Sequence, residues 1–263
     1  MRSTPFLLLL LLAPSCDAVA PGAREDAAPE ADAPAAAMDA APWGPEAAVP
    51  CPPALLPGAA GVPLDDPRIT GWAAAVAAVA PGAGLDDAWT DASRALGPAE
   101  GNAAEVVSLG RGGSITLVFD PPLRDGPGDD LAVYENSFSP TFLELAFVEV
   151  SSDGVVFERF DSRSLWPDPV GPFGETDPAA YEGLAGVHPK GLGTAFDLSL
   201  LACRAAATSG ALDLDRVSQV RVVDVVGDGS TTDSFGNPVY APYPTTGSAG
   251  FDLDGIAALA DDP

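Results

Sequence analysis

The sequence predicts an all-β protein: an antiparallel jelly-roll-like β-sandwich with a short N-terminal helix, preceded by a disordered stalk. After about residue 100 the chain consists of short apolar runs, separated by Gly, Pro, Asp and Ser. Helical spacing is found near the start of the domain, mainly over residues 69–79, and no repeat of fixed period is found. Short strands with helix only at the start favour a sandwich over a propeller or a solenoid.

The first residues have the pattern of an export signal. Met1 and Arg2 give a positive start, and 6–12 is an unbroken apolar run. This run is too short to span a bilayer, and no other stretch approaches that length. We therefore expect membrane attachment only through a lipid anchor.

Two cleavage sites compete in this leader. Residues 12–16 resemble a bacterial lipobox, which would make 1–16 the signal peptide and Cys16 the lipidated residue, although Pro14 is unusual in that motif. The alternative is signal-peptidase cleavage after 18–20, where Pro21 is unfavourable. The lipobox is preferred because the tail that follows is suited to a tether.

That tail, residues 17–52, is almost entirely Ala, Pro, Asp, Glu and Gly. A segment with little to bury and many prolines is expected to stay extended and disordered, as a stalk. Residues 53–263 are long enough for one sizeable domain, the β-sandwich.

The charge of the chain excludes some partners. Lys and Arg number 12 against 38 Asp and Glu, a formal net charge of −26. Nucleic acid and anionic lipid would be repelled by such a chain. The expected partners are an extracellular ligand or an envelope protein. The expected location is the cell envelope, as an outer-membrane lipoprotein, or the extracellular space.

Cysteine usage agrees with export. Lipidation of Cys16 leaves Cys51 and Cys203, which can form a disulfide in an oxidising compartment. The alternative is that these two cysteines are separate thiols.

The expected elements follow in order along the domain. The alanine-rich helix 69–79 starts after Asp66-Pro67-Arg68, and a short helical turn is expected within 86–96. The sequence Asp153-Gly154 between apolar runs predicts a hairpin. Period-two patterns and apolar runs predict strands over 114–119, 130–136, 143–150, 155–160, 217–226 and 251–259.

Two irregular stretches, 160–193 and 227–250, are too long to be plain connectors. Loops of that length on a rigid sandwich either bind something or cover part of the core.

A family resemblance is carried by seven segments: Trp72, 95–97, 107–113, 131–136, 146–154, 191–198 and 250–255. These segments resemble a group of bacterial secreted or surface proteins usually labelled only "cell surface protein", some of which carry PEP-CTERM sorting tails. This resemblance implies an envelope or extracellular location and no established catalytic activity. The order of strands is also loosely similar to the jelly-roll modules of the galactose-binding-like class, which bears on the fold alone.

Acidic residues at strand ends are the candidates for a cation site. The strand period puts Asp252 and Asp254 on one face, about 6–7 Å apart. An EF-hand is excluded, because the closing position falls on Pro263. A different oxygen cage for Ca²⁺ is one interpretation, and ordinary turn residues on an acidic surface are the other. The candidate ligands are Glu135, Asn136, Asp224, Asp228, Asp252 and Asp254, with Asp233 and Asn237 nearby in the sequence.

A catalytic constellation is hard to assemble. His188 is the only histidine, which excludes a zinc site built from several imidazoles, and no nucleophile elbow lies near it. We therefore predict no catalytic residues.

The long loops carry aromatic residues next to Asp and Asn, a combination that suits sugar faces and hydroxyls. The candidate ligand-binding residues are Trp166, His188, Tyr240 and Tyr243. The alternative is that these rings fix the loops to the sandwich. The sequence thus predicts a non-catalytic surface lipoprotein that binds a glycan or another extracellular ligand. A structural or interaction protein of the outer membrane is the alternative, with a two-carboxylate glycan hydrolase less favoured.

Overall fold

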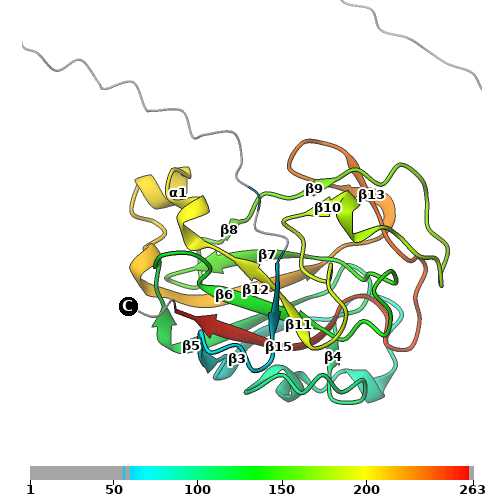
Figure 1. The fold of residues 1–263 in the computed structure, drawn as a ribbon, viewed down its shortest axis with the longest axis horizontal. Helices are drawn as coiled ribbons and strands as arrows, with labels where there is room; N and C mark the ends of the chain where they lie inside the picture. Colours follow the sequence, from blue (N-terminus) through cyan, green and yellow to red (C-terminus); the bar gives the residue numbers. More distant parts are fainter. Residues whose placement is uncertain (1–55, 57–59, 261–263) are drawn as a thin grey trace, which may run out of the picture. The chain divides into compact units, whose positions relative to one another are not determined.

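The computed structural model of this chain describes residue 56 and residues 60–260 (Figure 1), all within a compact unit spanning Val49–Pro263. The predicted signal peptide, the lipidation site Cys16, the stalk and Cys51 lie outside the described residues.

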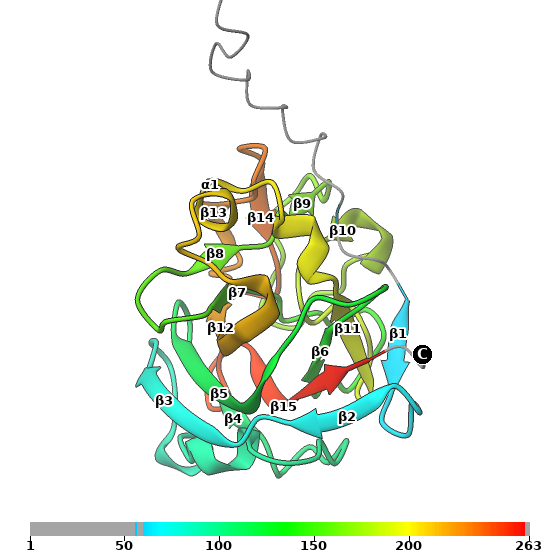
Figure 2. The ribbon, with the colours of Figure 1, turned by 90° about the vertical axis from the view of Figure 1, so that its left-hand side faces the viewer.

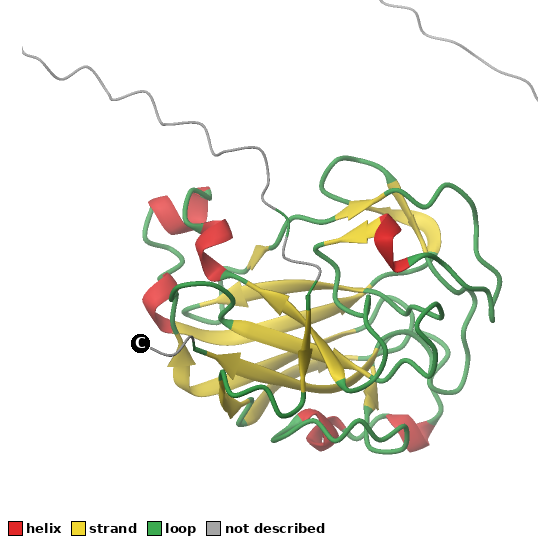
Figure 3. Cartoon of the chain, in the orientation of Figure 1, coloured by secondary structure: helices red, strands yellow, loops and turns green. Residues whose placement is uncertain are grey.

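The described chain forms two antiparallel sheets (Figure 3). The first has the order β1-β11-β6-β15-β2, with β4 also paired to β15, and the second has the order β3-β5-β12-β7-β8. The first sheet contains β1 (Gly61–Pro63), β11 (Leu192–Phe196), β6 (Leu131–Glu135), β15 (Asp252–Leu259), β2 (Ile69–Trp72) and β4 (Val107–Ser108). The second contains β3 (Ala75–Ala80), β5 (Ser114–Leu123), β12 (Val217–Asp224), β7 (Ala146–Ser151) and β8 (Glu158–Arg159).

The longer strands alternate between the two sheets along the chain. β5, β7 and β12 belong to the second sheet, while β6, β11 and β15, which follow them in turn, belong to the first. The fold is an antiparallel all-β sandwich, as the sequence predicts.

A single apolar core fills the space between the sheets. Ile115, Leu117 and Phe119 of β5 are buried on one face, as their alternation predicts. They join Val220 of β12 and Val133 of β6 in the same cluster. Burial of these side chains is the main favourable contribution to folding.

The predicted helix 69–79 is wrong. This segment forms β2 and β3, which pair with different sheets (Figure 2). Ala73 donates its backbone N–H to Ile256 in the first sheet, and Ala74 donates to Val118 in the second. Pairing with both sheets overrides the helix propensity of alanine, and Gly71 and the β-branched residues lower that propensity further.

Other local predictions are confirmed. Residues 86–96 contain two short 3₁₀ helices, η1 (Asp87–Trp89) and η2 (Ala92–Ala95). β7 and β8 form the expected hairpin, in which Gly154 has φ +74° and Asp153 accepts the backbone N–H groups of Val155 and Val156.

The remaining helical elements are single turns, and two short ribbons lie over the second sheet (Figure 1). The turns are η3 (Pro178–Ala180), η4 (Leu198–Leu201), α1 (Ala205–Thr208) and η5 (Leu214–Arg216). The ribbons are β9 (Arg163–Ser164) with β10 (Tyr181–Glu182), and β13 (Asp228–Thr232) with β14 (Pro238–Tyr240).

The two long loops cover the outer face of the second sheet. Tyr181 and Leu184 from the first loop and Val239 from the second are buried in one cluster with Phe147 of β7. The loops therefore contribute a second apolar layer, which explains why β7 is buried on both faces.

Cys203 is disulfide-bonded. Its pairing with Cys51 stays a prediction, since Cys51 is not among the described residues. Among those residues, no helix is long and apolar enough to cross a membrane.

One ion-pair network joins three strands of the second sheet. Glu149 of β7 is buried, and its carboxylate binds Arg159 of β8 at 2.6 Å and also Arg221 of β12. The two guanidinium groups lie over Phe147 and Phe157, at 4.2 and 3.9 Å from the ring centroids. Two guanidinium groups, each packed over an aromatic ring, thus satisfy a single buried acid.

We predict that Glu149→Gln lowers the free energy of unfolding by about 2–3 kcal/mol, because it leaves two guanidinium groups without their shared carboxylate. Urea unfolding measures this effect. The matched control is Glu182→Gln, which removes the half-exposed partner of Arg163 and is expected to cost less than about 1 kcal/mol. Equal losses in the two variants would contradict this account.

Candidate ligand-binding site

A pocket of ≈ 540 Å³ lies at the meeting point of β6 and β15. Leu253 pairs with Glu135, and the backbone N–H of Asn136 donates to the carbonyl of Asp252 at 3.2 Å. Antiparallel pairing therefore places the end of one strand beside the start of the other. Glu144, just before β7, completes the polar floor. We call this site the acid pocket, with Glu135, Asn136, Glu144 and Asp252 as its floor.

Glu135 is the most deeply buried acid of the pocket floor. Its exposed fraction is 3%, and its Oε2 accepts the backbone N–H of Ser137 at 2.7 Å. Burial raises the pKa of Glu135 well above its usual value, and the charges of Glu144 and Asp252 raise it further. This carboxyl group is therefore protonated more readily than an exposed one.

Glu144 and Asp252 influence each other's protonation. Burial, followed by the charge of Asp252, raises the pKa of Glu144 well above its ordinary value. Burial also raises the pKa of Asp252 to about 7, although the hydroxyl of Ser108 donates to its Oδ1. The two carboxyl groups titrate as a pair.

Asp224, at the end of β12, lies behind the floor. Its two oxygens accept the backbone N–H groups of Gly112 and Phe251, both at 2.7 Å. Burial raises the pKa of Asp224 to about 7 against these hydrogen bonds, and the charge of Asp252 adds to the effect. This residue joins three segments and also adds negative charge behind the pocket.

Asn136 has an unused acceptor in this pocket. Its exposed fraction is 6%, it lines the pocket, and its side-chain Oδ1 has no hydrogen-bond partner in the described structure. A buried carbonyl oxygen without a partner is costly to the folded state.

Aromatic side chains form the wall and the rim. Phe138 and Phe142 stack with their ring centroids 4.5 Å apart, and Trp89 and Phe173 also line the pocket. Phe138 and Phe173 are 70% and 87% exposed. Two exposed phenylalanines at the mouth of one pocket mark it as a place where a ligand can bury apolar surface.

The structure brings together only some of the predicted cation ligands. Glu135, Asn136 and Asp252 line the acid pocket, and Asp224 lies next to it.

The other predicted cation ligands have local roles. Asp254 accepts the backbone N–H groups of Glu100 and Gly101. The exposed Asp228 caps Ser230 in β13. Asp233 accepts three backbone N–H groups and the side chain of Asn237, which closes the turn of the β13–β14 ribbon.

The four predicted ligand-binding residues do not line the acid pocket. Trp166 packs against the apolar layer over the second sheet. Tyr240 accepts the hydroxyl of Tyr181 through its main-chain carbonyl, and Tyr243 lies near the guanidinium of Arg111. His188 lines a separate pocket of ≈ 490 Å³, where burial lowers its pKa.

Sequence reasoning did not select Glu144, Phe138, Phe142 or Trp89 for the site. Glu144 carries a usable signal, since it is a single acid between Leu143 and Leu145 in an otherwise apolar run. A charged residue at a buried position is informative because it is rare.

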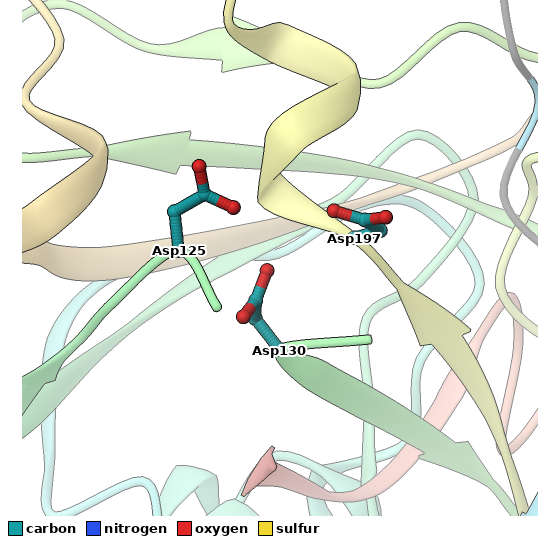
Figure 4. Close-up of side chains that lie close together, drawn as sticks. All are labelled: Asp125, Asp130 and Asp197. Carbon is teal, nitrogen blue, oxygen red and sulfur yellow. The ribbon is translucent and has the colours of Figure 1, made fainter. Parts of the chain in front are cut away.

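A second acidic group lies away from the acid pocket (Figure 4). Oxygens of Asp125, Asp130 and Asp197 come within 4.8 Å of one another, a spacing that could hold a metal ion. Local structure accounts for part of this aspartate cluster: Asp130 accepts the backbone N–H groups of Gly126 and Leu198, and Asp197 caps η4. None of the three was among the predicted cation ligands.

Comparison with known proteins adds no assignment. No protein-family model matches this chain, and no curated protein matches it.

We predict that the protein loses stability as the pH rises from 4 to above 7. The pKa values of Asp224 and Asp252 are about 7 in the folded state, against 3.8 for an unperturbed aspartate. The folded state therefore holds more protons than the unfolded state in this pH range. The stability that these protons provide is lost as the pH rises past the folded-state pKa values. The free energy of unfolding should be at least about 2 kcal/mol lower at pH 8 than at pH 5.

Urea unfolding at the two pH values measures this difference. Asp252→Asn should reduce it, whereas Asp168→Asn, the same change at an exposed position, should leave it intact. Equal stability of the unmodified protein at pH 5 and pH 8 would contradict the prediction.

Proposed function

We propose that this protein is a non-catalytic binding module of the cell envelope, and that it binds a glycan or a similar small extracellular ligand in the acid pocket. The observation that carries the proposal is the combination within one pocket of exposed aromatic rings, buried acids and one buried acceptor without a partner, the Oδ1 of Asn136. The export signal and the lipobox ending at Cys16 support the envelope location.

The chemistry of the pocket suits a ligand rich in hydroxyl groups. Phe173 and Phe138 at the mouth offer flat faces for the apolar side of a sugar ring. Asn136 offers a free acceptor. Carboxyl groups with raised pKa values, such as that of Asp252, can donate as well as accept near neutral pH.

The position of the two rings supports binding over a purely structural role. A ring that fixes a loop to the sandwich is buried, as Tyr181 is at 4% exposure, whereas Phe173 is 87% exposed. Exposed aromatic rings gain by contact with a partner.

We expect a glycan array followed by calorimetry to identify a ligand, and we expect Phe173→Ala to weaken its binding about tenfold, because one stacking face is lost. The matched control is Phe235→Ala, which removes another exposed phenylalanine, in the turn between β13 and β14, that does not line the acid pocket. Absence of any glycan binding, or equal weakening by both variants, would contradict the proposal.

The same experiment distinguishes the other two functional classes. Release of shortened glycan that stops in Glu144→Gln would indicate a hydrolase, since two carboxyl groups in one pocket also serve that chemistry. Capture of an outer-membrane protein without any glycan binding would indicate an interaction protein.

Calcium stays a prediction for this chain. We expect Ca²⁺ to raise the Tm and EDTA to lower it, because a cation that binds only the folded state stabilises that state. Differential scanning calorimetry measures both effects. Loss of the Ca²⁺ effect in Asp130→Asn but not in Asp252→Asn would place the ion at the aspartate cluster, and the reverse would place it in the acid pocket. An unchanged Tm would contradict the prediction that the protein binds calcium.

A further inference from the structure

The acid pocket has an unbalanced charge. Its floor contains Glu135, Glu144 and Asp252, with Asp224 behind them. In the part of the chain that the structure describes, no Lys or Arg forms an ion pair with any of these four acids. The charge of Arg111 acts on Asp224 and lowers its pKa, so the unbalanced acids are those of the floor. Glu149, by contrast, is buried to the same extent as Glu144 and has two arginines. Buried acids without a counter-ion repel one another and favour a ligand that brings positive charge.

The free acceptor on the floor is an independent observation. Asn136 lines the pocket, and its buried side-chain Oδ1 has no donor among the described residues. A ligand group that satisfies it must donate a hydrogen bond or be a cation. Together with the acids, this acceptor favours a ligand with a positively charged hydrogen-bond donor.

The spacing of the acids bears on whether a metal ion binds them directly. A directly coordinated Ca²⁺ holds its oxygens within about 5 Å of one another. Within residues 60–260, the group of three acids that meets such a limit is the aspartate cluster, and the acids of the pocket are not among them. An ammonium group has three donors and does not need three carboxylate oxygens this close together.

The wall of the pocket also suits an organic cation. Trp89, Phe138 and Phe142 face the same space as the acids. Aromatic faces attract ammonium groups and bury the carbon skeleton that carries them.

We propose that the ligand of the acid pocket carries an ammonium group on a ring-shaped body, and that this group donates to Asn136 and to the carboxylates of Glu144 and Asp252. This inference rests on the proposed function in taking the acid pocket as the ligand site. The ligand class it names is an amine-bearing glycan, such as a sugar with an unacetylated amino group. The chemistry is shared with ring-bearing amines that contain no sugar.

Two matched pairs of probes test the inference by calorimetry on the full chain. The first pair is the trimer of glucosamine and the trimer of N-acetylglucosamine, which differ in whether the nitrogen is charged. The second is phenethylamine and phenethyl alcohol, which contain no sugar. We expect the amine of each pair to bind about tenfold or more tightly than its neutral counterpart, because hydrogen bonds between charged groups are the stronger kind.

The pairs separate failure of this inference from failure of the proposed function. Equal binding of the two trimers would contradict the inference that the ligand carries an ammonium group, and it would still support glycan binding. Binding of phenethylamine with neither trimer would overturn the glycan function and support the ammonium group. No binding of any probe would overturn both.

Variants locate the ammonium group. Glu144→Gln should reduce the preference for the amine, because one of the two carboxylates is lost, and Asn136→Leu should weaken the amine about tenfold. Asp168→Asn removes the same charge from an exposed loop position and should change neither probe. Each variant is checked for an intact thermal transition. A preference for the amine that persists in Glu144→Gln and Asp252→Asn would place the charge recognition elsewhere and overturn the assignment.

Discussion

The antiparallel pairing of β6 with β15 is the constraint on which the rest of this structure depends. Both strands lie at the centre of the first sheet, and both contribute side chains to the core between the sheets. The pairing also sets Asn136 beside Asp252 and carries Glu135 into the interior. A shift of one residue in this register would exchange core and outer faces along the strand. The same backbone hydrogen bonds therefore fix the apolar core and the floor of the acid pocket.

Two kinds of buried acid occur within this sandwich, and the contrast between them is informative. Glu149 has two guanidinium groups, so its charge is balanced inside the fold. Glu135, Glu144 and Asp252 have hydroxyl and backbone donors but no described cationic partner, and burial raises the pKa of each. Groups of the second kind lower the stability of the folded state near neutral pH. Perturbed acids that gather in a pocket with exposed aromatic rings are more readily explained by a ligand than by folding.

Local patterns predicted much of the fold. The alternation of Ile115, Leu117 and Phe119 correctly identified the face of β5 that lies in the core. A period of two can be recognised from the sequence because it depends only on residues that are neighbours along the strand. The helix predicted over 69–79 was wrong because the conformation of this segment depends on partners distant in sequence, Val118 and Ile256. The predictions for the site were likewise correct in part. Acids at strand ends were found, whereas the choice among loop aromatics required knowing which segments of the two long loops cover β7 and which reach the pocket.

The acid pocket draws its floor and its mouth from different kinds of structure. Glu135 and Asp252 belong to paired strands, while Phe138 and Phe173 lie in loops and are exposed at the pocket mouth. Substitutions at the mouth can alter shape and stacking without disturbing the hydrogen bonds that hold the acids. A lineage of such proteins could therefore exchange one sugar body for another while retaining the same charge recognition, so that its specificity would diversify fastest at the loop aromatics.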